Sequence, residues 1–385
     1  MKSFSAFTQL PQSSKELAPK KYLEEPVSGN QMAESEEFEK PRFDGCRFAN
    51  PISFHGWTGV PGPIDCFKWK FIEDDFSQIP SDEVLNETLP IRKPNFHKAS
   101  QLSLTWLGHA TVLVRMGGVT FVTDPVWAKK ASPISIMPGY RRYRPPPAAY
   151  EDLPELDFGL ISHCHYDHLD ARSVRTLSSM FSRMLWFVPL GLGHWMVKNG
   201  VPASNVHEMN WGDHRTFDFN GNSCEIWCVP AQHWSQRTLF DRYKSLWSSW
   251  AVVGESRRFY FTGDTGYCER EFDKLGKKLG PFDLAAISIG CYAPVWFMKS
   301  QHISPAEAVK IHQKIAAKKS IGIHWGTYEM GGNESYLDPP RLLKEEVLKA
   351  GLNAADFTAI AHGETWTEED SSSSETDTVS DLKSS

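Results

Sequence analysis

Residues 163–168 run His-Cys-His-Tyr-Asp-His and follow an apolar run, residues 156–162, that is typical of a buried strand. Imidazoles two residues apart share a face of an extended segment, and the Asp-His pair can turn back toward the same point. One short loop therefore offers four candidate metal ligands: His163, His165, Asp167 and His168. A solvated polar turn is the alternative interpretation. Because α/β proteins place ligands where a strand enters a loop, we expect a metal site at a sheet edge.

Length and composition indicate a globular protein that does not coat nucleic acid. The 385 residues are 41% hydrophobic and 12% aromatic, which is enough for a large core, and the net charge is -6. We expect one catalytic domain over residues 46–367, between a disordered segment at 1–45 and a disordered Ser-rich, acidic tail at 368–385. Seven cysteines without Cys-x-x-Cys spacing indicate reduced thiols in an intracellular compartment.

Apolar runs alternate with turn residues along this domain, first as hairpins and later with helix-length gaps. The runs are residues 102–116, 119–123, 158–162, 185–188, 225–230, 250–253, 259–262, 284–289 and 320–324. Ser304, Pro305 and Glu307 predict a capped helix start just behind His302. A second helix is expected over residues 340–349, before Gly351. The pattern predicts an α+β fold in which two sheets pack face to face with helices outside.

Three further candidate ligands each follow a predicted strand: His233, Asp264 and His324. Each alone is weak evidence, because a histidine at a strand end is usually structural and Gly-Asp-Thr-Gly is an ordinary turn. Their shared position, together with the row at 163–168, favours ligation of a metal ion.

In this order of ligands the sequence resembles the metallo-β-lactamase superfamily over roughly residues 100–365. The resemblance implies an αββα sandwich with a dinuclear centre of two Zn²⁺ ions at one edge of the sheets. His163, His165 and His233 would hold one ion, Asp167, His168 and His324 the second, and Asp264 would bridge them. Asp124, in Val-Thr-Asp-Pro, resembles an acid that orients a ligand imidazole, although a simple turn is an equal alternative.

Longer strings are similar to the family of N-acyl-phosphatidylethanolamine-hydrolysing phospholipases D. They lie at residues 105–111, 186–192, 261–268, 280–286, 296–299 and 323–327. The resemblance implies hydrolysis of N-acyl-phosphatidylethanolamine to N-acylethanolamine and phosphatidic acid through a metal-bound hydroxide. It also implies a homodimer at a membrane surface, with Tyr166 binding substrate and His302 contacting substrate or delivering a proton. His109 and His362 recur in these strings without an argument of their own.

The sequence predicts that any association with a membrane is peripheral. Its most apolar run, residues 184–197, is interrupted by Pro and Gly and falls short of the ~20 residues of a spanning helix. Residues 137–147 combine three arginines with two tyrosines, which suit anionic headgroups, although a solvated loop is the default interpretation. The alternative functions are a lactonase or RNA phosphodiesterase on the same fold, or a lipid-binding protein without turnover. The acidic balance disfavours the RNA version.

Overall fold

The computed structural model describes residues 37–98, 100–132, 140–329 and 331–368. The segments expected to be disordered lie outside these ranges at 1–36 and 369–385. Residues 37–45, also assigned to the disordered lead, are placed against the domain, because Phe38 is buried and Arg42–Phe43 forms a short strand, β1.

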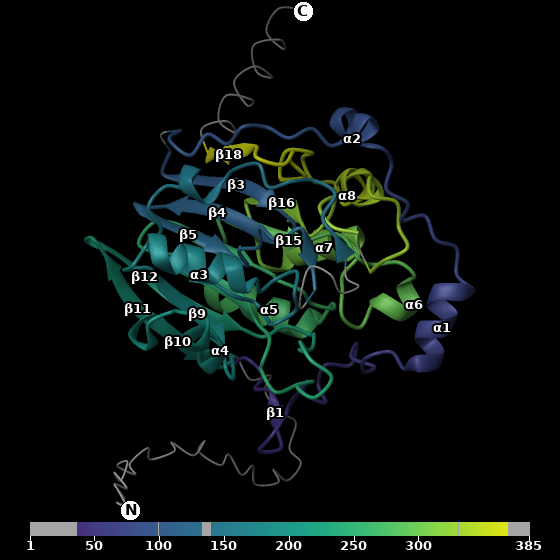
Figure 1. Cartoon of the computed structure of the whole chain (residues 1–385), viewed down its shortest axis with the longest axis horizontal. Coiled ribbons are helices and arrows are strands. Elements are labelled where there is room, and N and C mark those ends of the chain that lie inside the picture. The colour runs from purple at the N-terminus through teal and green to yellow at the C-terminus, as the bar shows by residue number, and fades with distance from the viewer. Residues whose placement is uncertain (1–36, 99, 133–139, 330, 369–385) are drawn as a thin grey trace, which may run out of the picture.

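Two seven-stranded sheets make up the centre of the described structure (Figure 1). The first has the order β10-β9-β8-β5-β4-β3-β18. Its strands are β3 (Leu102–Gly108), β4 (Thr111–Met116), β5 (Val119–Thr123), β8 (Phe158–Leu160), β9 (Leu185–Pro189), β10 (Val206–Met209) and β18 (Thr365–Thr367). The expected hairpin at residues 116–119 is confirmed, since Met116 pairs with Val119.

The second sheet has the order β11-β12-β13-β14-β15-β16-β17. Its strands are β11 (His214–Phe219), β12 (Asn222–Val229), β13 (Ser249–Gly254), β14 (Arg258–Phe261), β15 (Leu284–Ser288), β16 (Lys319–Ile323) and β17 (Phe357–Thr358). Three further short strands lie outside both sheets: β2 (Phe48–Ala49), β6 (Lys130–Ala131) and β7 (Tyr140–Arg141).

Helices cover the outer faces of both sheets, so the layers run helix, sheet, sheet, helix (Figure 1). Helices α3 (Ala171–Met180) and α4 (Gly193–Lys198) pack on the first sheet, and α5 (Glu269–Leu279), α7 (Pro305–Lys314) and α8 (Asp338–Lys349) pack on the second. Helices α1 (Pro63–Phe71), α2 (Asp82–Thr88) and α6 (Val295–Met298) lie at the margin (Figure 1). The expected αββα sandwich is confirmed.

The main core lies between the two sheets and is strongly aromatic. Phe121 stacks on Phe158 at 4.6 Å from the first sheet and meets Phe259 of the second edge-on at 5.4 Å. The buried indole of Trp250 donates to the carbonyl oxygen of Ile161 at 2.8 Å, so one core side chain ties the sheets together just before the histidine row. Pairing of a buried indole N–H in this way avoids the cost of an unmade hydrogen bond.

Strand direction brings the candidate ligands to one edge. In the first sheet β5 and β8 are parallel, and β3 runs the same way because two antiparallel pairings separate it from β5. In the second sheet the same reasoning makes β12 parallel to β14, which is itself parallel to β15 and β16. The carboxyl ends of these strands lead into the loops that carry the metal-ligand candidates, as expected for an α/β site.

Three expectations need correction. The apolar run 102–116 contains two strands rather than one, because the chain turns at residues 109–110. The helix expected from residue 340 begins at Asp338. Of the arginines expected to face headgroups, Arg142 and Arg144 are buried and donate to Val126 O and to Asn86.

In the described part of the chain, no helix is both long and apolar enough to cross a bilayer.

The capping box of α7 gives the first testable prediction. Ser304 Oγ accepts from Glu307 N at 3.4 Å and the Glu307 carboxylate accepts from Ser304 N at 2.9 Å. Ser304→Ala should lower the free energy of unfolding by about 1 kcal/mol, measured by urea denaturation. Ser81→Ala is the control, because Ser81 caps α2 without a side-chain cap bond. An equal loss in both variants would contradict the assigned role of the box.

Candidate metal centre

The seven residues expected to bind metal converge at the sheet edge. Their nitrogen and oxygen atoms fall into two groups, and within each group the candidate ligand atoms lie within 4.8 Å of one another. The first group is His163, His165, His233 and Asp264. The second contains Asp167, His168 and His324 together with His109. Ligands from loops of both sheets therefore surround two adjacent points.

Asp264 lies between the two groups. Its carboxylate is 3.9 Å from His163 Nε2 and 3.7 Å from His233 Nε2 on one side. On the other side it is 3.3 Å from His168 Nε2 and 3.0 Å from His324 Nε2. Its Oδ2 atom makes the contacts to His163, His233 and His168, and its Oδ1 atom makes the contact to His324, so one carboxylate reaches both groups.

Asp124 fixes the orientation of one ligand directly and of another through Ser162. The carboxylate accepts from His168 Nδ1 at 2.6 Å, and from the backbone N–H and hydroxyl of Ser162 at 2.7 and 2.5 Å. Because that hydroxyl donates to Asp124, it is free to accept from His163 Nδ1, 2.9 Å away. The protons are thus held on Nδ1, and Nε2 of both rings faces the centre as a lone pair.

Two more imidazoles are oriented by other means. His233 Nδ1 donates to the carbonyl oxygen of Gln301 at 2.8 Å, which leaves Nε2 toward the centre. His165 presents its Nδ1 instead, 2.7 Å from His163 Nε2 and 3.3 Å from His233 Nε2. Ring nitrogens this close need a shared proton or a cation between them.

The unpaired atoms of the site fit a bound cation. Buried atoms without a hydrogen-bond partner among the described residues include His168 Nε2, His324 Nε2 and Asp264 Oδ1. Such atoms are costly to leave unpaired, and carboxylate and imidazole are ligands that suit Zn²⁺. The donor set therefore fits the dinuclear metal centre that the sequence predicts.

Charge within the cluster supports the same fit. Burial lowers the pKa of His163 well below its usual value and lowers the pKa values of His165 and His233 to about 4 and about 3. Burial opposes charge on His168 too, yet the Asp264 and Asp167 carboxylates raise its pKa well above the usual value. The Asp264 and Asp167 carboxylates therefore favour positive charge at this point, which a bound cation would supply.

Several backbone positions beside the centre are strained. His109, Asp124 and His324 have φ values of 54°, 32° and 62°, in a region that residues other than glycine rarely adopt. Such conformations cost on the order of 1–3 kcal/mol each and persist only where the surroundings impose them. Gly290 packs closely against His324, because a Cβ at position 290 would collide with the His324 carbonyl oxygen.

His109 is the residue of the cluster that sequence reasoning missed. It follows β3, its Nε2 lies 3.0 Å from Asp167 Oδ2, and its carbonyl oxygen accepts from His324 N at 2.9 Å. Its ring also contacts that of His324, with centroids 4.1 Å apart. The available signal was its place in the string 105–111.

The two residues expected to meet substrate lie at different distances from the cluster. His302 is mostly buried, and its Nδ1 is 3.8 Å from Asp264 Oδ2. Tyr166 is partly exposed and its hydroxyl donates to the carbonyl oxygen of Arg237 at 2.9 Å. His165 and Asp167 are also partly exposed, so the cluster opens to solvent beside Tyr166.

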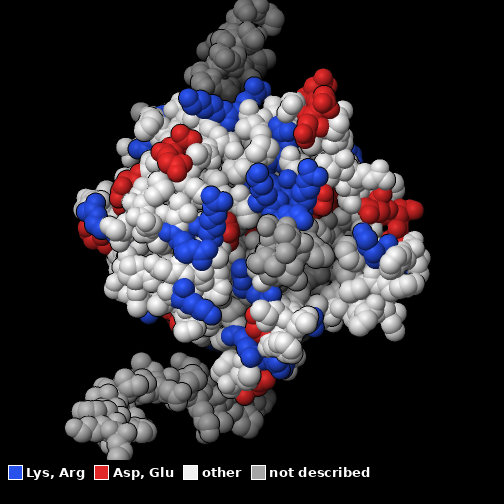
Figure 2. Space-filling model, in the orientation of Figure 1, with Lys and Arg blue, Asp and Glu red and all other residues white. Residues whose placement is uncertain are grey.

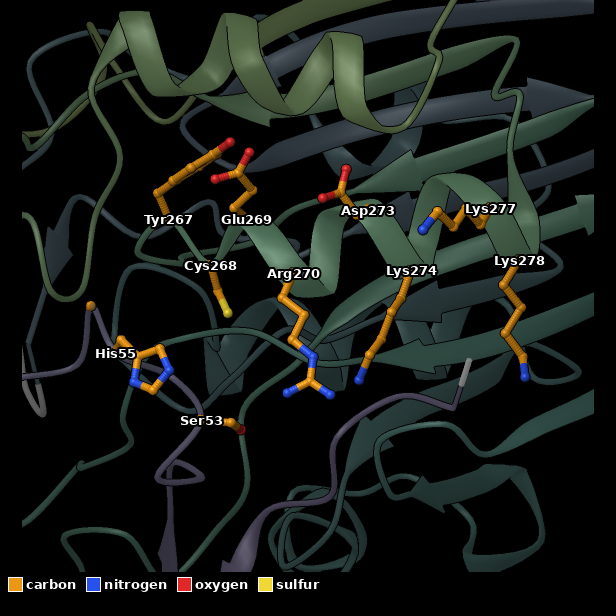
Figure 3. A pocket seen from close by; sticks show the side chains of 11 residues that line it. Ser53, His55, Tyr267, Cys268, Glu269, Arg270, Asp273, Lys274, Lys277 and Lys278 are labelled. Carbon is orange, nitrogen blue, oxygen red and sulfur yellow. The ribbon is translucent and has the colours of Figure 1, made fainter. Parts of the chain in front are cut away.

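A separate hollow lies along α5 and includes none of the cluster residues (Figure 3). Arg270, Lys274 and Lys278 extend from α5 toward the amino-terminal segment (Figure 3). Glu39 lies 3.6 Å from Arg270 and 3.8 Å from Lys274, and Glu37 lies 2.9 Å from Lys278. These cations are therefore already paired with acids of the chain itself.

The sequence and fold have informative relatives. Residues 120–325 match the profile described as the Beta-lactamase superfamily domain. N-acyl-phosphatidylethanolamine-hydrolyzing phospholipase D 1 of Caenorhabditis elegans is 51% identical over 349 residues, which cover 89% of this chain and 98% of that protein. The mitochondrial phospholipase D of the same name from Saccharomyces cerevisiae is 34% identical over 62% of this chain and 50% of its own.

Among solved structures, a possible metal-dependent hydrolase from Veillonella parvula superimposes with a TM-score of 0.54 at 17% identity, over 70% of this chain and 100% of that one. This likeness concerns the fold alone. The Caenorhabditis elegans relative, by contrast, is similar in sequence over most of the chain. The chain therefore belongs to the metallo-β-lactamase superfamily and, within it, to the family of N-acyl-phosphatidylethanolamine-hydrolysing phospholipases D.

Proposed function

We propose that this protein is a Zn²⁺-dependent phospholipase D that hydrolyses N-acyl-phosphatidylethanolamine to N-acylethanolamine and phosphatidic acid. The observation that carries the proposal is the 51% identity to a phospholipase named for this substrate, over 89% of the chain. The converging seven-residue ligand set supports it from the structure. Two Zn²⁺ ions per subunit and a homodimer are parts of the proposal that the family resemblance implies.

The residues of the chain divide the work as follows. His163, His165 and His233 would hold one ion, Asp167, His168 and His324 the other, and Asp264 both. Bound there, the ions would activate water and stabilise the charge that develops at phosphorus. Asp124 keeps the His168 ring turned toward the centre through the 2.6 Å hydrogen bond.

His302 and Tyr166 are proposed to contact the substrate. His302 borders Asp264 and keeps some exposure, so its ring can reach a phosphodiester oxygen bound at the cluster. Burial lowers the pKa of His302 to about 3, which favours a neutral ring that donates a hydrogen bond. The exposed edge of Tyr166 lies beside the opening of the cluster, where the lipid would enter.

An apolar surface at the margin supports the proposed membrane contact. Helix α1 has no buried residue, and Ile64, Phe67 and Phe71 form one stripe along it with exposures of 84%, 58% and 73%. Large exposed apolar patches mark sites of interaction. Lys68 lies 4.3 Å from the ring of Trp296 in α6, so α1 and α6 form one surface beside the loop to His302.

Basic side chains are more numerous than acidic ones in the middle of the face shown in Figure 2. The chain as a whole carries a net charge of -6, so this is a local excess rather than a global one. Local clusters of Lys and Arg attract anionic phospholipid headgroups over about a Debye length. The charge of this face is thus compatible with a peripheral place on a membrane.

The direct test is hydrolysis by the purified protein. Vesicles containing N-acyl-phosphatidylethanolamine should yield N-acylethanolamine and phosphatidic acid, measured by mass spectrometry. A chelator should stop release and added Zn²⁺ should restore it, because the ligand cluster needs cations to be competent. A homoserine lactone and a short RNA serve as alternative substrates. Turnover of either one without phospholipid hydrolysis, or stoichiometric zinc without any turnover, would reject the proposal.

Two substitutions separate metal binding from substrate contact. Asp264→Asn should lower affinity for both metal equivalents by more than about 100-fold and nearly abolish turnover, because it removes the bridging charge. His302→Ala should keep both equivalents while slowing hydrolysis about 100-fold. Metal content is measured by atomic emission and activity as kcat/KM, with Asp218→Asn on the exposed β11 as control. Equal metal loss in the first two variants would overturn this division of roles.

The apolar surface gives a prediction on lipid binding. Phe67→Ser combined with Phe71→Ser should weaken binding to phosphatidylcholine vesicles at least tenfold, because each buried ring is worth about 1.5–3 kcal/mol. Co-sedimentation measures the bound fraction. Leu348→Ser on α8 is the matched control, since Leu348 is a helical residue with 54% exposure away from α1. Unchanged binding of the double variant would place the membrane contact elsewhere.

A further inference from the structure

The guanidinium of Arg237 lies against the inside of the histidine row. Its Nη1 donates to two backbone carbonyl oxygens, that of Cys164 at 2.7 Å and that of Leu169 at 2.8 Å. Cys164 is the second residue of the row and Leu169 follows its last. One nitrogen thus joins the two ends of the segment that contributes four ligands.

The row itself forms a tight turn whose shape these two bonds complete. The N–H groups of His168 and Leu169 both donate to the carbonyl oxygen of His165, at 3.1 and 2.9 Å. The carbonyl oxygens of Cys164 and Leu169 do not take part in these turn bonds. Hydrogen bonds from a charged donor are stronger than the neutral bonds of the turn.

Arg237 is held from both sides. Its guanidinium carbon lies 4.0 Å from the ring centroid of Tyr166 and 5.0 Å from that of Trp195. Its backbone carbonyl oxygen accepts from the Tyr166 hydroxyl at 2.9 Å, and its N–H donates to Asp241 at 2.9 Å. Tyr166, which belongs to the row, therefore contacts Arg237, and Arg237 in turn donates to the backbone of the row.

We propose that Arg237 is a positioning residue for the metal centre, which holds residues 164–169 in the curve that aims His165, Asp167 and His168 at the two cations. A planar guanidinium that stacks and donates at once suits this position better than an ammonium group does. The inference rests on the metal binding of the proposed function and not on its phospholipid substrate. It also gives Tyr166 a role within the protein, in addition to the proposed contact with lipid.

The test is metal affinity, measured with Co²⁺ by competition with a chelator and by the visible spectrum of the bound ion. Arg237→Met should weaken binding about 10- to 100-fold, as removal of groups that orient metal ligands does. Arg237→Lys, which keeps the charge, should recover part of the loss. Tyr166→Phe keeps the ring under the guanidinium and should bind Co²⁺ nearly as the parent does.

The matched control is Arg242→Met. Arg242 belongs to the same loop and lies over a ring, that of Trp234 at 5.5 Å, but it donates to Gln236 rather than to the row. Parental affinity in Arg242→Met with a loss in Arg237→Met supports the proposal, and equal affinity in the two overturns it. If Arg237→Met fails to fold, Arg237→Lys decides, since an unchanged Co²⁺ affinity and spectrum there would also overturn it. None of these readouts depends on phospholipid hydrolysis.

Discussion

The candidate metal centre depends on hydrogen bonds to the histidine nitrogens that face away from it. Asp124 collects three of them, from two atoms of Ser162 and one of His168, and Ser162 passes the restraint to His163. Because a neutral imidazole has one proton, fixing it on Nδ1 decides which nitrogen can bind a cation. The strained φ of 32° at Asp124 shows that the backbone yields to this arrangement. The hydrogen bonds of Asp124 and Ser162 thus decide which nitrogen atoms of His163 and His168 face the centre.

The core supports the same loops from below. Trp250 donates to Ile161 O at 2.8 Å, directly before the histidine row, and Trp247 donates to Ala231 O at 2.9 Å, two residues before His233. Each indole fills space between the sheets and also satisfies a loop carbonyl that would otherwise be buried without a partner. The same two tryptophans thus pack the core and support the loops that carry the candidate ligands. A change in the spacing of the sheets or in strand register would therefore also shift these loops.

The sequence predicted most of the residues that meet at the cluster, because a row such as 163–168 and single polar residues at strand ends are local patterns. The αββα order was predicted from the alternation of strand and helix patterns. The hairpin at 116–119 was predicted from its turn residues, and the start of α7 from its capping residues. His109 was missed because the turn that carries it lies within an apolar run, where periodicity gives no break. Arg142 and Arg144 were misplaced because burial of a guanidinium depends on distant carbonyl and amide oxygens, which no local pattern shows.

The first sheet is closed by a strand from the far end of the described chain. In β18, Thr365 pairs with Thr105 of β3, and their hydroxyl groups are 2.8 Å apart. During synthesis β3 forms long before residue 365 leaves the ribosome, so one edge of this sheet stays unpaired for most of translation. Unpaired edges invite pairing with other chains. A nascent chain of this architecture therefore needs protection until its last strand arrives, and a message that ends early yields a product prone to aggregate even when every metal ligand has been made.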